Sequence, residues 1–201
     1  MLRDLPIFPL STVLFPGGAL PLRVFEARYV DMVSDCMRRA SPFGVCLITR
    51  GGEVGEAAEH EPVGSLATIV DWDMEQPGVL QVRTRGGERF RVAARRVQAD
   101  GLVRADAQPL APEPDAAIGA EFAPCVALLR KIVDDLERRE PNPVSRRVLG
   151  PYDFESARWV GNRLCEFLPI PARAKQKLME LDDALARLSL VRDYLQQHRV
   201  L

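Results

Sequence analysis

The side chains that could carry nucleophilic catalysis are scattered along this sequence. Ser11 and Ser145 have no histidine close to them in the chain, and the two histidines, His60 and His198, stand far apart. A serine nucleophile needs a base within hydrogen-bonding reach. The spacing therefore favours a protein without a catalytic site, and we expect no enzyme activity. A small hydrolase whose site is assembled from distant residues stays open as an alternative.

Two pairs of adjacent aspartates carry side chains that can transfer protons, Asp134-Asp135 and Asp182-Asp183. Neighbouring residues on a helix point about 100° apart, whereas two carboxyls that share a proton must face one site. We expect surface and capping roles instead, with Asp182 as the cap of the last helix.

Metal and cofactor chemistry finds no support in the spacing of the ligand-type residues. A zinc site usually contains a short C-x₂₋₄-C pair, and the chain has none. The glycines between Gly51 and Gly55 lack the Lys and Ser/Thr of a phosphate-binding loop. We therefore expect no cofactor, no metal and no disulfide. We expect buried free thiols at Cys36, Cys46, Cys125 and Cys165.

Arginines concentrate in one quarter of the chain, between residues 83 and 104. The sequence predicts a hairpin of strands 79–85 and 88–98 around Gly86-Gly87. Alternate positions on such a hairpin share a face, so Arg83 and Arg85 would gather with Arg89 and Arg91. This patch is either a solvated face or a contact for phosphates or an acidic partner.

The segment from Leu5 to Tyr29 organises the elements that must position these residues. Its prolines, Pro6 and Pro9, place the first strand at an edge or interrupt it. Phe15-Pro16-Gly17-Gly18 is typical of a type II turn. The apolar residues before this turn are either core or an exposed apolar lip that grips a partner. They are Val13, Leu14 and Phe15.

Further strands and helices follow from periodicity. A helix is predicted over 26–39, because its apolar residues recur at helical spacing. Strands are predicted over 43–49, 63–72 and 102–108, with loops at 50–61 and 73–78. A proline-rich linker over 108–115 precedes helices at 118–136, 154–168 (capped by Asp153), 172–181 and 185–195, with a second linker at 140–151.

The opening segment resembles the N-terminal, substrate-binding domain of Lon proteases. The resemblance rests on PLSTVLFPG (Pro9 to Gly17), LPL (Leu20 to Leu22) and FEARY (Phe25 to Tyr29). The stretch from Phe167 to Leu188 is also similar to the end of that region. The resemblance implies a PUA-like β-barrel that binds polypeptides. It is strongest to the stand-alone bacterial version, without the ATPase and protease domains.

These observations predict an α+β fold. We expect a partly closed β-barrel or folded sheet with one embedded helix over residues 1–110, followed by a helical bundle over 111–201. The function expected is a non-catalytic module for unfolded or apolar polypeptide segments, or an adaptor. The alternative is RNA binding through the arginine-rich hairpin, although 27 basic against 28 acidic residues leave a net charge of −1. We expect a cytoplasmic protein with no membrane partner, since no long apolar segment occurs.

Overall fold

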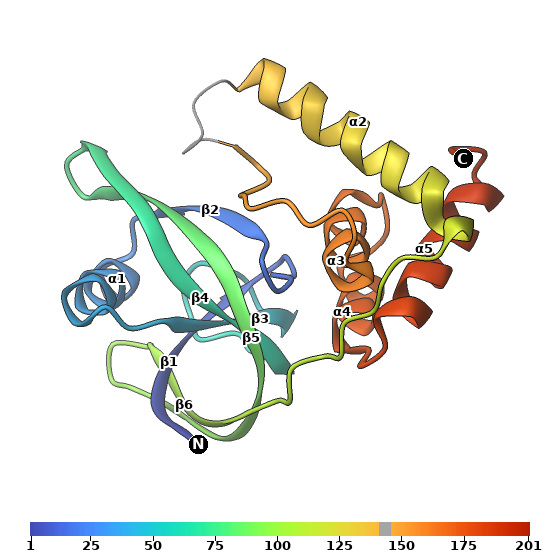
Figure 1. Ribbon diagram of the computed structural model, residues 1–201. Helices are drawn as coiled ribbons and strands as arrows, with labels where there is room; N and C mark the ends of the chain where they lie inside the picture. The colour runs from blue at the N-terminus through green and yellow to red at the C-terminus, as the bar shows by residue number, and fades with distance from the viewer. Residues whose placement is uncertain (141–145) are drawn as a thin grey trace. The chain divides into compact units, whose positions relative to one another are not determined.

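The computed structural model describes residues 1–140 and 146–201, and the chain divides into two compact units, Met1–Pro112 and Glu113–Leu201 (Figure 1). Among the described residues, no helix is long and apolar enough to cross a membrane. The predicted linker over 140–151 lies partly outside the described residues.

The N-terminal unit contains six strands and one helix, α1 (Ala27–Arg39). Five strands close into a ring, because β6 pairs with both β1 and the last part of β5, while β2 pairs with β5 at residues 80–85. This arrangement confirms the predicted α+β fold with a partly closed barrel and one embedded helix. The strands are β1 (Leu2–Leu10), β2 (Ala19–Val24), β3 (Phe43–Arg50), β4 (Glu59–Gln76), β5 (Val79–Val97) and β6 (Val103–Pro109).

The strand β1 tolerates two prolines because it changes partners along its length. Residues 2–7 pair antiparallel with β6, and residues 7–10 pair parallel with β3. Pro6 and Pro9 therefore each lie in a stretch with a ladder partner on one side only, where a missing N–H can face away from the ladder. The pairing with β6 is also irregular between Leu2 and Leu5. The strand itself is continuous from Leu2 to Leu10 and lies inside the ring, and only its pairing with β6 is irregular, ahead of both prolines.

The predicted hairpin around Gly86-Gly87 is wrong. β5 runs without a break from Val79 to Val97, and the chain reverses earlier, after Gln76, where Gly78 has a φ of +81°. Gly86 is required for another reason. Its N–H donates to the Gly18 carbonyl (2.8 Å), its carbonyl accepts from the Gly17 N–H (2.7 Å), and a Cβ there would lie 2.2 Å from the Phe15 carbonyl oxygen. Only glycine permits this close approach of two backbones.

The turn that meets Gly86 has the predicted geometry. Gly17 has a φ of +76°, and the Gly18 N–H donates to the Phe15 carbonyl at 2.9 Å, which are the features of a type II turn. The core beneath it is closed by α1, whose buried stripe matches the sequence pattern. The buried members of that stripe are Tyr29, Met32, Val33 and Cys36.

The C-terminal unit is helical, with a 3₁₀ turn (Ala120–Phe122) before α2 (Ala123–Arg139), then α3 (Ala157–Phe167), α4 (Ala172–Glu180) and α5 (Ala184–Gln197). Two predicted caps are wrong by a few residues. Ser156, not Asp153, caps α3 by accepting from the Trp159 N–H (2.9 Å), and Asp183, not Asp182, caps α5 by accepting from Ala186 (2.9 Å). In both helices the N-cap is the residue that directly precedes the first turn.

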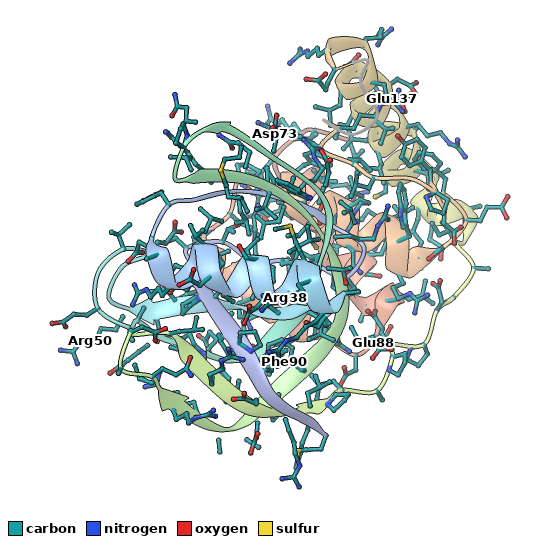
Figure 2. All side chains as sticks on the ribbon, turned by 90° about the vertical axis from the view of Figure 1, so that its left-hand side faces the viewer. Arg38, Arg50, Asp73, Glu88, Phe90 and Glu137 are labelled. Carbon is teal, nitrogen blue, oxygen red and sulfur yellow. The ribbon has the colours of Figure 1, made fainter. Side chains whose placement is uncertain are left out.

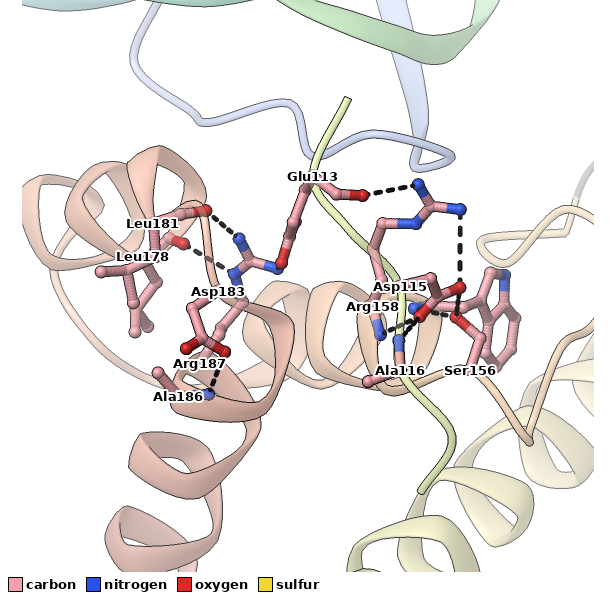
Figure 3. A network of polar contacts seen from close by, with 11 residues as sticks. Glu113, Asp115, Ala116, Ser156, Arg158, Leu178, Leu181, Asp183, Ala186 and Arg187 are labelled. Carbon is pink, nitrogen blue, oxygen red and sulfur yellow. Dashed lines mark hydrogen bonds and ion pairs between the residues drawn. The ribbon is translucent and has the colours of Figure 1, made fainter. Parts of the chain in front are cut away.

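A buried ion pair ties the start of this unit to its last helix. The Arg187 guanidinium donates to both carboxylate oxygens of Glu113 at 2.8 Å, and to the carbonyls of Leu178 (2.7 Å) and Leu181 (2.6 Å) (Figure 3). Both side chains are almost fully buried. The carbonyls at the end of α4 and beyond it thereby find donors, and residue 113 is fixed against α5.

The neighbouring Asp115 carboxylate holds the start of α3. It accepts from the Ser156 hydroxyl (2.6 Å) and from the backbone N–H groups of Ala116 (2.9 Å) and Arg158 (3.1 Å) (Figure 3). Burial alone would raise the pKa of Asp115, but these hydrogen bonds to the charged form outweigh it and lower the pKa. The segment that precedes α2 is therefore bonded to the first turn of α3.

Candidate functional site

The free edge of β2 borders a groove of about 360 Å³ in the N-terminal unit. β2 has one neighbour in the sheet, β5, so its other edge is not part of the ladder. An edge strand offers backbone N–H and C=O groups to an incoming chain. The groove is lined by Phe8, Leu10, Thr12, Leu20, Pro21, Leu22, Arg23, Val24, Phe25, Glu26, Tyr29, Glu53 and Val54.

The floor of this β2 groove is apolar and buried. The Phe8 and Tyr29 rings stack with centroids 4.0 Å apart, and Leu22 and Val24 are buried beside them. The rim carries two large apolar side chains in water: Phe25 is 51% exposed and Val54 is 61% exposed. Exposed apolar groups around an apolar floor are typical of a surface that loses water on binding.

One wall of the groove is held in place by Arg28, which is buried at the start of α1. Its guanidinium donates to the Glu26 carboxylate (2.9 Å) and to the carbonyls of Gly55 (2.5 Å) and Gly101 (3.1 Å). Glu26 in turn accepts from the Gly55 N–H at 3.3 Å. The loop that carries Glu53 and Val54 is therefore fastened to α1 through Arg28 and Glu26.

Charged residues that line or adjoin the groove influence the pKa of Tyr29. Burial raises the pKa of Tyr29, Arg28 opposes this, and the carboxylates of Glu26 and Glu53 add to the increase. Glu53 also accepts from the Ser11 N–H at 2.7 Å. Tyr29 therefore stays neutral at physiological pH, and its ring is part of the apolar floor.

The structure places two of the three residues of the predicted apolar lip in the core. Leu14 and Phe15 are buried and Val13 is half-buried. The Leu14 carbonyl accepts from the buried Ser65 hydroxyl at 2.6 Å, and the Phe15 carbonyl lies against Gly86. Of the two predicted alternatives, Leu14 and Phe15 are therefore core residues and do not form an exposed lip. A binding role for these three residues stays a prediction.

The predicted arginine patch is arranged differently from the hairpin that we expected. Arg83, Arg85 and Arg91 all lie on the one strand β5, because no turn separates them. Arg83 lies opposite Asp71 of β4, and Arg85 opposite Thr68. Arg83, Arg85 and Arg89 each interact with other groups of the chain, and Arg89 is buried. Arg91 is exposed, at the level where β5 pairs with β6.

The candidate catalytic and ligand residues are dispersed. His60 contacts the Glu61 carbonyl (2.8 Å) in the first unit, and His198 contacts the Tyr194 carbonyl (2.8 Å) in the second. Burial lowers the pKa of His60. Ser145 lies outside the described residues. Among the residues that the structure describes, no group of three His, Cys, Asp or Glu could hold a metal ion.

The expected state of the cysteines is confirmed. Cys36, Cys46, Cys125 and Cys165 are all buried and free. Burial raises the pKa of the Cys165 thiol to about 12 and raises that of Cys46 further. Such thiols are inert at neutral pH, which makes them structural.

Sequence reasoning missed the β2 groove, although it identified the segments that build it. Leu20 to Leu22 and Phe25 to Tyr29 carry the family resemblance, and both line the groove. The sequence did contain a signal for this site. Pro21 marks a strand that belongs at an edge, and the aromatic residue Phe25 directly follows that strand.

Comparisons with known proteins give the family and agree with the fold. The family model of the ATP-dependent protease La (LON) substrate-binding domain matches residues 4–197. The crystal structure of a Lon N-terminal domain protein from Xanthomonas campestris is 34% identical, with a TM-score of 0.75, and the match covers 96% of this chain and 99% of that one. The N-terminal domain of the Mycobacterium avium complex Lon protease shares the fold at 16% identity, with a TM-score of 0.62 and coverage of 98% and 100%.

Longer proteins contain the same region. Lon protease 2 of Myxococcus xanthus is 26% identical over 198 residues, which are 97% of this chain and 24% of that protein. Protein cereblon of Danio rerio is 30% identical over 129 residues, which are 61% of this chain and 29% of cereblon. The chain thus spans about a quarter of the length of the curated relatives that it matches.

Proposed function

Because the chain belongs to the ATP-dependent protease La (LON) substrate-binding domain family, we propose that it binds extended polypeptide segments, above all apolar stretches of unfolded proteins. The β2 groove is the site that we assign to this activity. The observation that carries the proposal is the coincidence of an edge strand with an apolar groove along it.

The physical basis is strand addition. An extended peptide beside β2 would exchange backbone hydrogen bonds with that edge, and this supplies affinity without regard to sequence. Alternate side chains of the peptide would face the floor formed by Phe8, Tyr29 and Leu22. Each well-buried apolar side chain contributes about 1.5–3 kcal/mol, and these contacts together with the backbone hydrogen bonds must offset the entropy lost on association.

The test is a titration of a fluorescein-labelled casein fragment, followed by anisotropy, with the full chain. The variant Phe25→Asp, Val54→Asp places two charges on the exposed rim without touching the core. The control is Val97→Asp, which changes a valine at the end of β5 that is 52% exposed, close to the 51% of Phe25. We expect the rim variant to bind at least ten times more weakly, about 1.4 kcal/mol, and the control to bind like the parent chain.

Equal binding by the rim variant and the parent chain would refute the assignment to the β2 groove, and no binding by the parent chain would refute the function. Substitutions at Leu14 and Phe15 cannot serve here. Both side chains are buried, so Leu14→Asp or Phe15→Ser would test folding.

The two alternatives stay predictions with tests of their own. RNA binding predicts a salt-dependent shift of tRNA on a gel that is lost in Arg83→Glu, Arg91→Glu. A hydrolase predicts turnover in a broad esterase and peptidase screen. The net charge of −1 and the internal contacts of Arg83 and Arg85 favour polypeptide binding over the first.

A further inference from the structure

A second unpaired strand edge lies in the outer half of β4. β3 pairs with β4 between residues 59 and 67, whereas from Thr68 to Gln76 β4 pairs with β5 alone. β4 and β5 therefore run on together past β3 as a hairpin (Figure 1). With β2 on the far side of β5, this part of the sheet is a three-stranded ribbon whose two edges are the β2 groove and the outer half of β4.

The outer half of β4 exposes three large apolar side chains, although its pairing with β5 shifts register between Ile69 and Asp71 and again between Asp73 and Gln76. Trp72 is 55% exposed and Met74 45% exposed, and Val70 precedes them with similar exposure. Trp72 lies directly opposite Val82 of β5, which lies opposite Leu22 of β2, and residues paired in this way share a face. Val82 and Leu22 are buried in the core, so the exposed Trp72 lies on the same face of the sheet as these core residues.

The other face of the same edge is acidic. Asp71 and Asp73 are exposed and alternate with the apolar residues, and Figure 2 shows Asp73 toward the outer end of the hairpin, away from Phe90 in the barrel core. Asp71 lies opposite Arg83, whereas Asp73 lies opposite the uncharged Gln81. An added strand beside β4 would therefore meet apolar groups on one face and the carboxylates of Asp71 and Asp73 on the other, while the arginines of that face lie on the inner strands β5 and β2.

This charge pattern selects against a second copy of the chain. If two β4 edges paired antiparallel with Trp72 at the centre, Asp71 of one copy would lie opposite Asp73 of the other. Like charges directly opposite destabilise a pair of strands, and charges on an exposed edge are a common defence against edge-to-edge association. The occupant that fits must bring positive charge to this face.

We propose that the edge of β4 from Val70 to Met74 is a second polypeptide-binding site, which takes an extended segment with alternating basic and apolar residues as an added strand. The apolar side chains of the segment lie over Trp72 and Met74. Its lysines or arginines lie beside Asp71 and Asp73. This site is separate from the β2 groove and selects charge, whereas the groove selects apolar character.

Trp72 provides a direct readout, because the chain has two tryptophans and Trp159→Phe leaves Trp72 as the only one. The full chain carrying Trp159→Phe is titrated with three short peptides: alternating Lys-Val, alternating Glu-Val, and a Lys-Val peptide of equal composition with the lysines in one block. We expect a saturable blue shift of the Trp72 emission with the first peptide, at least tenfold weaker binding of the other two, and weakening by salt.

Asp71→Asn, Asp73→Asn should reduce the affinity for the alternating Lys-Val peptide at least tenfold, whereas Phe25→Asp, Val54→Asp should leave it unchanged. This separates failure of the β4 site from failure of the β2 groove. Equal affinity for the Glu-Val peptide, or no shift with any peptide, would overturn the proposal. A blue shift that grows with protein concentration alone would also overturn it, since a second copy would then cover the edge.

Discussion

Replacing Gly86 with alanine tests the contact that joins the N-terminal turn to β5. The new Cβ would lie 2.2 Å from the Phe15 carbonyl oxygen, a backbone atom that cannot rotate away. Overpacking of this kind costs about 1–3 kcal/mol. Separation of the backbones also weakens the two hydrogen bonds between Gly86 and the glycines Gly17 and Gly18, each worth about 0.5–1.5 kcal/mol. We expect a loss of roughly 2–6 kcal/mol in the free energy of unfolding.

The assay is urea denaturation of the full chain, followed by circular dichroism, with Gly87→Ala as the matched control. A Cβ at Gly87 would lie 3.4 Å from the Leu66 Cβ, an ordinary contact, so the control should lose less than about 1 kcal/mol. If Gly86→Ala is as stable as Gly87→Ala, the two backbones do not approach as described, and a turn at Gly86-Gly87 becomes the better account.

Two further predictions concern the C-terminal unit. Arg187→Met should destabilise the protein by about 3–5 kcal/mol in denaturant titration, because it leaves the Glu113 carboxylate buried without its partner. The double variant Glu113→Gln, Arg187→Met should cost less than Arg187→Met alone. Equal losses in the two variants would contradict the ion pair between Glu113 and Arg187. Burial raises the pKa of Glu166 to about 7, against the smaller lowering effects of Arg163 and Lys175, so the folded protein holds a proton there that the unfolded chain releases near pH 4.5. The contribution of Glu166 to the free energy of unfolding should therefore decrease as the pH rises from about 4.5 to 7, and a slope unchanged in Glu166→Gln would contradict this account.

Local patterns predicted the elements whose cause is local. The stripe of α1 and the turn at Phe15-Pro16-Gly17-Gly18 follow from residues a few positions apart, and both are confirmed. The hairpin predicted at Gly86-Gly87 was wrong because the sequence does not distinguish a glycine that permits a turn from a glycine that permits a close backbone contact. The partner that decides between them, Phe15, is about 70 residues away.

The candidate site was harder to predict because it is built from the end of β1, the edge of β2, the start of α1 and the loop at Glu53 and Val54. No single segment of the sequence is sufficient to predict the groove. The apolar residues before the first turn drew the prediction instead, and two of them, Leu14 and Phe15, complete the core. Exposure depends on what packs against a residue, and long-range pairing decides that.

Amide hydrogen exchange across β2 tests the central proposal most directly. The exchange of residues 19–24 is measured in the full chain, free and saturated with the casein fragment. Strand addition predicts slower exchange at the alternate β2 amides that point away from β5, with little change in β3. Saturated binding that leaves the exchange of every β2 amide unchanged would contradict the assignment of the groove as the polypeptide site.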